Sequence, residues 1–157
     1  KQFALLLFSF IILLNPLYSI ITIHPHQQVY FNILAGKDPM LNFEGDYWGQ
    51  SYRKGLEYIE ANDSRDSITI VYINSPGKKN YYFLDKKFRS KLKFKPFENN
   101  NDLDNSDYLI TNFRDLTNYR DNIDNYKKSK QGIYPYNNEV YSVRIGEMIV
   151  IGLYKLE

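Results

Sequence analysis

Two glycine-containing stretches carry residue types that are used in catalysis. In the first, Ser51 follows Gly49-Gln50, which is half of the motif in which hydrolases hold a serine nucleophile. The second glycine of that motif is missing and no predicted strand precedes it, so we do not expect a serine hydrolase. In the second, Lys78 and Lys79 follow Pro76-Gly77, but the glycine-rich loop that cradles phosphates is absent. Neither stretch therefore predicts a reaction.

Carboxylate and imidazole pairs offer too few ligands for a metal. Asp102 and Asp104 lie one residue apart, the spacing at which the two carboxylates of an Asp-x-Asp pair chelate a divalent ion. The same triplet is common in acidic turns, and here it lies in an asparagine-rich loop, so we favour the turn over the metal site. His24 and His26 flank Pro25, and two imidazoles need further ligands to hold zinc. We expect no metal, no cofactor and no catalytic residue in this sequence.

Charge and cysteine content exclude several functional classes. The formal net charge is +2, too balanced for a nucleic-acid partner, and the absence of cysteine excludes disulfides, thiolate ligands and a cysteine nucleophile. One basic run could meet anionic lipid head groups, although a solvated face is the favoured reading. Its residues are Lys86, Lys87, Arg89, Lys91, Lys93 and Lys95.

The segment from 24 to 52 combines polar and aromatic side chains that suit a sugar ligand. Amide, carboxylate and hydroxyl groups can hydrogen-bond a sugar, and an aromatic ring can stack on its apolar face. The same side chains can instead tie a soluble domain to a membrane helix, and we favour that structural role. The candidate substrate-binding residues are His24, His26, Gln27, Tyr30, Asn32, Asp46, Tyr47, Trp48, Ser51 and Tyr52.

An uncharged apolar segment, 3–23, precedes these residues and predicts a membrane helix over 1–23. About 20 residues at roughly 1.5 Å each cross a hydrocarbon core of about 30 Å. Lys1 stands before the segment and no Lys or Arg follows until Lys37, so we expect the rest of the chain outside the cytoplasm. A cleaved signal peptide and a buried core helix are the alternatives. Because the sequence begins with Lys, we expect it to be the end of a longer protein.

The remaining elements predict a small α/β sandwich behind a collar over 24–46. Asp46 can cap a helix over 47–61, in which Trp48, Tyr52, Leu56 and Ile59 form one apolar stripe. The apolar runs 67–73 and 107–113 predict central strands, and the alternating run 92–97 predicts an edge strand. We further expect a helix over 80–90, a surface connection over 114–138, and a terminal hairpin of strands 139–144 and 148–155. The soluble domain then covers 47–157.

A resemblance covers most of the chain and is dense over 24–52. The residues that carry it are His24-Pro25-His26-Gln27-Gln28-Val29-Tyr30-Phe31-Asn32, Leu34-Ala35-Gly36 and Phe43-Glu44-Gly45-Asp46-Tyr47-Trp48-Gly49-Gln50-Ser51-Tyr52. They resemble the segment after the last membrane helix of bacterial polytopic glycosyltransferases of the GT-C type, similar to protein O-mannosyltransferases and dolichyl-phosphate-mannose-dependent enzymes. His26 stands where that family usually has Tyr, and Lys37 replaces its second Gly. Residues 107–110 and 140–156 also resemble the family's late strand and terminal hairpin.

The resemblance implies the C-terminal extracytoplasmic domain of an enzyme of the bacterial inner membrane. Such enzymes take a sugar from a polyprenyl-phosphate donor. The implied partners are membrane lipid, the upstream transmembrane bundle of the same chain, and the lipid-linked sugar bound by the whole protein. Because the family's proposed catalytic carboxylates lie in early loops, no catalytic residue is assigned here. The alternatives are a non-catalytic envelope-binding or scaffolding module anchored by one helix, and a secreted protein that retains its signal.

Overall fold

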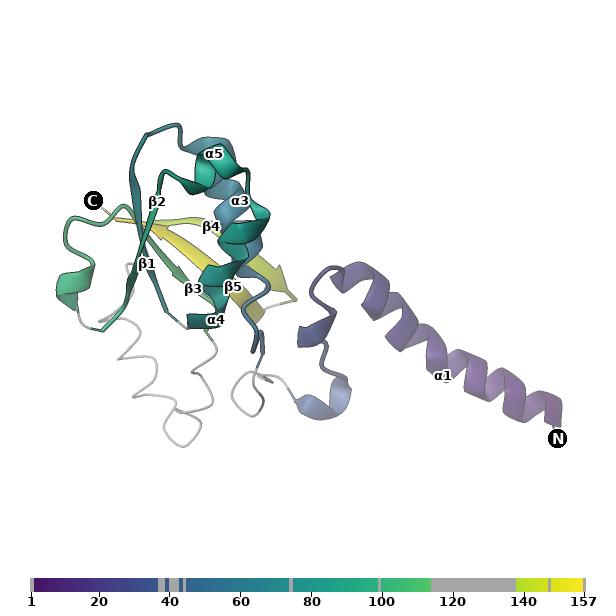
Figure 1. Cartoon of the computed structure of the whole chain (residues 1–157). Coiled ribbons are helices and arrows are strands. Elements are labelled where there is room, and N and C mark those ends of the chain that lie inside the picture. The colour runs from purple at the N-terminus through teal and green to yellow at the C-terminus, as the bar shows by residue number, and fades with distance from the viewer. Residues whose placement is uncertain are drawn as a thin grey trace.

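A long helix extends from an α/β domain in the computed structural model of the chain (Figure 1). The structure describes residues 2–36, 39, 43, 45–73, 75–98, 100–113, 138–146 and 148–156. Helix α1 (Gln2–Ile23) is followed by two short 3-10 turns, η1 (Gln27–Val29) and η2 (Ile33–Ala35). These turns belong to the predicted collar, which connects α1 with the domain.

Helix α1 is long and apolar enough to cross a membrane by length and composition. Its 22 residues carry no charge, and none of its side chains is buried against the rest of the chain. A core helix buries an apolar stripe, so the exposure of α1 argues against that alternative. The finding fits both a membrane anchor and a signal sequence.

The domain is built on one five-stranded mixed sheet with the order β2-β1-β3-β5-β4. Strand β1 (Ile68–Tyr72) pairs in parallel with β2 (Leu92–Pro96) and with β3 (Tyr108–Thr111). Strand β5 (Met148–Lys155) is antiparallel to both β3 and β4 (Glu139–Ile145). The predicted C-terminal hairpin, the central strands and the edge position of β2 are therefore confirmed.

The central strands are apolar on both faces because both faces are covered. Ile70 and Ile110 lie in the core cluster that includes the helices, whereas Val71 and Leu109 lie in a second cluster on the opposite face. All four are fully buried. Side chains alternate between faces along a strand, so a continuous apolar run is the pattern of a strand buried on both sides.

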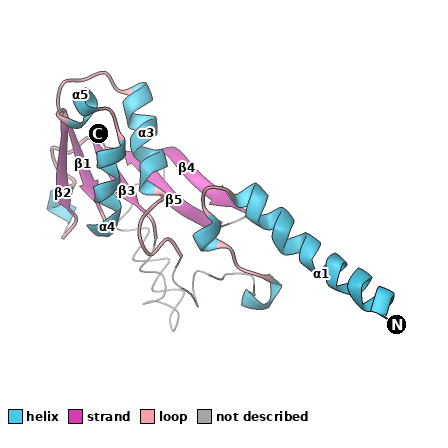
Figure 2. Cartoon of the chain, turned by 45° about the vertical axis from the view of Figure 1, so that its right-hand side comes forward, coloured by secondary structure: helices cyan, strands magenta, loops and turns pink. Residues whose placement is uncertain are grey.

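Helix α3 (Tyr52–Asn62), the 3-10 helix η3 (Lys79–Phe83) and helix α5 (Lys86–Arg89) pack against one face of the sheet (Figure 2). Helix α3 buries Tyr52, Leu56 and Ile59. Helix α4 (Ser75–Lys78), η3 and α5 connect β1 to β2, and η4 (Asn100–Asp102) precedes β3. The α/β class is confirmed, and the predicted sandwich is not.

The predicted helix start at Tyr47 is wrong, because residues 46–51 form turns and α3 begins at Tyr52. Gly49 adopts a φ of +66°, which ends any helix before it. The predicted apolar stripe loses its first member as a consequence. Trp48 is 67% exposed instead of packed under the helix.

The helix predicted over 80–90 is two short helices with a break at Leu84 and Asp85. The Asp85 carboxylate accepts a hydrogen bond from the Lys87 backbone N–H at 2.7 Å and so begins a new helix, α5. Of the connection expected over 114–138, only residue 138 is described.

Candidate functional site

The segment after α1 is tied to the domain through Asp46, whose side chain is fully buried. Its carboxylate accepts the backbone N–H groups of Gln50 at 2.9 Å and Ser51 at 2.8 Å, and the Ser51 hydroxyl. Gln28 of η1 donates its side-chain amide to the same carboxylate at 3.4 Å. The backbone carbonyl of Asp46 accepts the side-chain amide of Asn112, just beyond β3, at 2.7 Å. Asp46 therefore joins three parts of the chain that are distant in sequence.

Two glycines allow the turn over residues 46–51 to lie against α4. A β-carbon on Gly49 would lie 2.5 Å from the α-carbon of Gly77, and one on Gly77 would lie 2.4 Å from the ring of Tyr52. Asn80 holds the same contact by donating its side-chain amide to the carbonyls of Gly49 at 2.7 Å and Gly77 at 2.9 Å. The turn over residues 46–51 is therefore held against α4 and Asn80.

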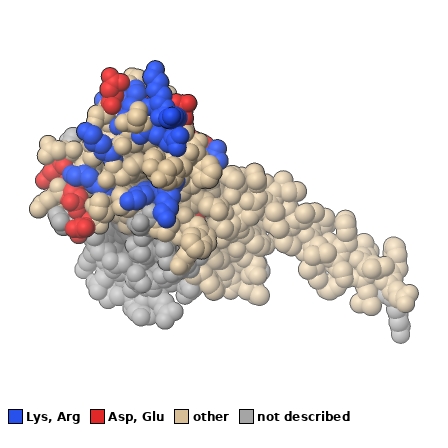
Figure 3. Space-filling model, in the orientation of Figure 1, with Lys and Arg blue, Asp and Glu red and all other residues tan. Residues whose placement is uncertain are grey.

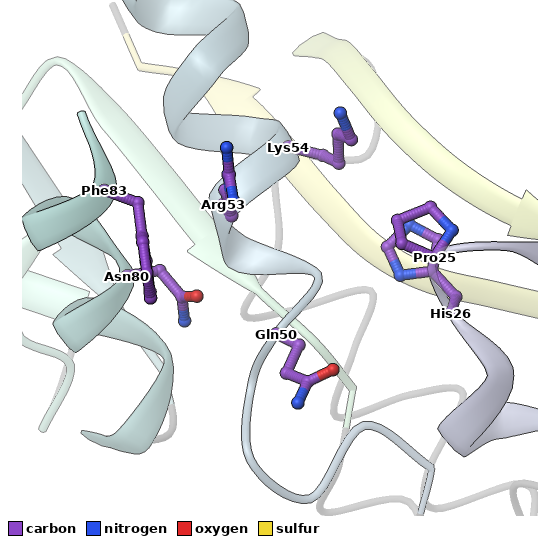
Figure 4. A pocket seen from close by; sticks show the side chains of 7 residues that line it. All are labelled: Pro25, His26, Gln50, Arg53, Lys54, Asn80 and Phe83. Carbon is purple, nitrogen blue, oxygen red and sulfur yellow. The ribbon is translucent and has the colours of Figure 1, made fainter. Parts of the chain in front are cut away.

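A cavity of about 370 Å³ lies between the segment after α1 and the domain. Figure 4 shows the side chains of α3 between those of η3 and those that follow α1. The lining residues are Pro25, His26, Gln50, Arg53, Lys54, Asn80 and Phe83.

A second cavity, of about 460 Å³, adjoins the first and shares Gln50, Asn80 and Phe83 with it. Its other lining residues are Trp48, Pro76 and Lys79. We call the two cavities together the junction groove. One end of this groove carries the cations Arg53 and Lys54, and the other carries Trp48 beside Lys79. Phe83 lines both cavities, and Trp48 and Phe83 are each 67% exposed.

At the cationic end, the carboxylate of Glu57 binds both Arg53 and Lys54. Arg53 Nε lies 2.7 Å from Glu57 Oε1, and Lys54 Nζ lies 3.0 Å from Glu57 Oε2. Burial opposes ionisation of Glu57, but the hydrogen bonds from Lys54 and Arg53 outweigh it and lower its pKa. The Arg53 guanidinium also stacks over the Phe83 ring, 5.3 Å from its centroid. Two cations on one carboxylate leave this end positive.

His26 forms part of the wall and is buried, with 6% of its surface exposed. Burial lowers the pKa of its imidazole, the Asp46 carboxylate opposes this shift, and Lys54 and His24 add to it. No residue that the structure describes hydrogen-bonds its Nδ1 atom. His26 is therefore held mainly neutral and keeps an unused polar atom.

The candidate residues from the sequence fall into three groups. His26 and Trp48 line the groove. Asp46, Ser51 and Tyr52 are buried beneath it and support it. The remaining candidates contribute no side chain to either cavity: His24, Gln27, Tyr30, Asn32 and Tyr47.

Four of these five remaining candidates make side-chain contacts with nearby residues. Gln27 hydrogen-bonds His24 Nδ1 at 2.7 Å just beyond α1, and Asn32 accepts the Leu34 N–H at 3.0 Å. Tyr47 packs edge-on against Trp48, with ring centroids 4.9 Å apart. A role in substrate binding stays a prediction for all ten candidates.

Most of the groove is not recognisable from the sequence. Arg53 and Lys54 have the spacing of a solvated helix face, and Asn80 and Phe83 lie in the segment for which a helix over 80–90 is predicted. Figure 3 shows several Lys and Arg side chains on the visible face of the α/β domain, whereas α1 carries no charge. The sequence contains these aromatic and cationic residues, but only the fold brings them to one groove.

The aspartate pair at 102 and 104 has a structural contact. Asp102 accepts the Glu98 backbone N–H at 2.8 Å, and its carbonyl accepts the Ser106 hydroxyl at 2.9 Å. Within the described parts of the chain, no three His, Asp or Glu side chains are placed to hold a metal ion.

No family model, curated protein or solved structure matches this chain. The junction groove and its supports are therefore the basis for any functional assignment.

Proposed function

We propose that this chain is the C-terminal part of a membrane glycosyltransferase that takes its sugar from a polyprenyl-phosphate donor. In this proposal, α1 is the last membrane helix, the α/β domain lies on the extracytoplasmic side, and catalysis resides in upstream parts of the longer protein. The role of the domain is to position a substrate at the membrane surface.

One observation carries the proposal. A groove with a cationic end and an aromatic end lies directly beyond an apolar helix of 22 residues. Pro25 and His26, which line it, follow Ile23, the last residue of α1. Arginine and lysine suit phosphate, and aromatic side chains with amides suit a sugar ring, so the groove has the chemistry of a lipid-linked sugar.

The buried supports of the groove favour a rigid tie between domain and membrane helix. Asp46 receives donors from η1 and from the turn before α3, and Gly77 packs on Tyr52. A site must be held within a fraction of an ångström to position a substrate. The resemblance of residues 24–52 to the post-membrane segment of GT-C enzymes points to the same role.

The topology can be tested with a tag at the C-terminus of the longer protein. Protease added to intact spheroplasts should remove the tag, because the proposal places the domain outside. A cytoplasmic tag on the same protein is the matched control and should survive until the inner membrane is broken. A C-terminal tag that survives equally long contradicts this topology.

The activity can be tested by comparing two proteins in the same membranes. The longer protein should transfer sugar from polyprenyl-phosphate donors, and the 157-residue chain alone should transfer none. Activity in the chain alone would show that catalysis does not lie upstream. A longer protein without activity on any polyprenyl-phosphate donor, yet properly folded and inserted, would exclude the proposed enzyme and favour an anchored binding module.

A further inference from the structure

We propose that the junction groove binds the head group of a lipid-linked glycosyl phosphate. The phosphate lies at the end formed by Arg53 and Lys54, and the sugar ring lies at the end formed by Trp48, with Phe83 between the two ends. This inference rests on the proposed function, because it names the ligand of the site that the enzyme presents to the membrane.

The cationic end has hydrogen-bond donors that no described residue is shown to use. Among the contacts that the structure describes, Arg53 reaches Glu57 only through Nε, and Lys54 reaches it through a single bond. A guanidinium and an ammonium carry further N–H donors beyond these. Glu57 holds both side chains in place without neutralising both charges. The geometry suits a phosphate, which accepts several charge-assisted hydrogen bonds at once.

The aromatic end has the features of a sugar site. Trp48 and Phe83 each expose two thirds of their surface beside Gln50, Asn80 and Lys79, although Arg53 lies over the Phe83 ring. The Asn80 amide nitrogen is already bound to the carbonyls of Gly49 and Gly77, so its orientation is fixed. Its oxygen, which no described residue is shown to bond, can accept a hydroxyl. The Trp48 face beside the oriented Asn80 amide matches the apolar face and the hydroxyls of a hexose.

The position of the groove favours a membrane lipid over a soluble sugar phosphate. Its wall includes Pro25 and His26, two and three residues after the end of α1. If α1 crosses the membrane, this wall lies at the level of the lipid head groups, which occupy the outer part of the bilayer. His26 Nδ1, buried and without a hydrogen-bond partner among the described residues, adds a polar atom on that side.

Trp48 makes the proposal directly measurable because it is the sole tryptophan of the chain. The 157-residue chain is placed in phosphatidylcholine nanodiscs, and a polyprenyl-phosphate hexose is titrated in while Trp48 emission is recorded. We expect a saturable blue shift. The double variant R53Q/K54Q should bind about tenfold more weakly or worse, because charge-assisted hydrogen bonds are lost. R53K keeps the charge, so its affinity for the lipid should lie between those of the unchanged chain and the double variant.

Lys87→Gln is the matched control, since Lys87 is exposed on α5 and lines neither cavity. Its titration should equal that of the unchanged chain. Circular dichroism of every variant shows whether the fold is kept, and R53K provides a second test should the double variant unfold.

Four results would overturn the site. They are an equal blue shift with sugar-free polyprenyl phosphate, with phosphatidylglycerol nanodiscs or with soluble hexose 1-phosphate, and undiminished binding by a folded R53Q/K54Q variant. The proposed function fails separately, when the longer protein transfers no sugar although the groove binds the lipid. If the longer protein transfers sugar but the lipid causes no change in Trp48 emission, the proposed function stands and the proposed binding site in the groove is wrong.

Discussion

Gly77 lies so close to the ring of Tyr52 that a β-carbon at position 77 would be 2.4 Å from it. The contact joins α4 to the first residue of α3, and the carbonyl of Gly77 also accepts the Asn80 amide. The α3 side and the η3 side of the junction groove therefore both contact Gly77. In the sequence, Gly77 belongs to the stretch that lacks the glycine-rich part of a phosphate loop.

Gly77→Ala should destabilise the domain by about 1–3 kcal/mol, because a rigid aromatic ring must move to admit the methyl group. Thermal unfolding of the chain in detergent, followed by near-ultraviolet circular dichroism, measures the loss. Lys79→Ala removes an exposed neighbour and should change stability by less than about 0.5 kcal/mol. Equal melting of the two variants would contradict the close packing.

Asp46→Ala should destabilise the domain by about 1–3 kcal/mol, because the half-buried N–H of Gln50 and the buried N–H of Ser51 lose their acceptor. Hydrogen exchange should accelerate at these two amides more than in the central strands. Asp104→Ala serves as the control, since Asp104 is exposed. Unchanged exchange at Gln50 and Ser51 would mean that Asp46 does not hold the turn.

Trp48→Ala should leave stability within about 0.5 kcal/mol, since its side chain is mostly exposed, while it should weaken lipid binding by the groove. Ile70→Ala provides the contrast. Ile70 is fully buried in β1, and its truncation should destabilise the domain by about 2–5 kcal/mol. A Trp48→Ala variant that melts as early as Ile70→Ala would show that Trp48 is a core residue.

The stability of the domain should fall in acid through Asp63. Hydrogen bonds from Arg65, with Nη2 at 2.6 Å, are the largest cause of the lowered pKa of Asp63, and the Tyr108 hydroxyl adds one at 3.0 Å. Because the folded pKa lies below the unfolded value of 3.8, the stabilisation is present above that pH. It is lost as the pH falls further.

Urea unfolding between pH 6 and about 2.5 measures this dependence over the window where Asp63 titrates in the unfolded chain. Asp63→Asn should lower stability at pH 6 and flatten the acid decline. Asp66→Asn, at a fully exposed carboxylate, should preserve the decline. Identical pH profiles for Asp63→Asn and the unchanged chain would show that Asp63 does not cause the loss of stability in acid.

The sequence predicted the elements whose pattern is local. Ile68–Tyr72 and Tyr108–Thr111 are apolar on both faces, and Leu92–Pro96 alternates with lysine, so central and edge strands could be distinguished. The start of α3 was misplaced because one glycine, Gly49, adopts a left-handed conformation that a helical stripe does not reveal.

The groove could not be predicted, because its residues come from three separate elements. Arg53 belongs to α3, Phe83 to η3 and His26 to the segment after α1. In sequence, Arg53 follows the pattern of a solvated surface, and only its place above the Phe83 ring distinguishes it from other exposed arginines. Such a contact depends on tertiary structure, which periodicity does not report.

If this chain belongs to an enzyme that consumes a polyprenyl-phosphate sugar, as we propose, loss of the enzyme must change the pool of that lipid. Mass spectrometry can compare glycosyl polyprenyl phosphates extracted from cells with and without the gene for the longer protein. We expect one such lipid to accumulate when the protein is absent and to return to its usual level when the gene is restored. Unchanged levels of every glycosyl polyprenyl phosphate in the deleted strain would show that the protein does not consume such a lipid.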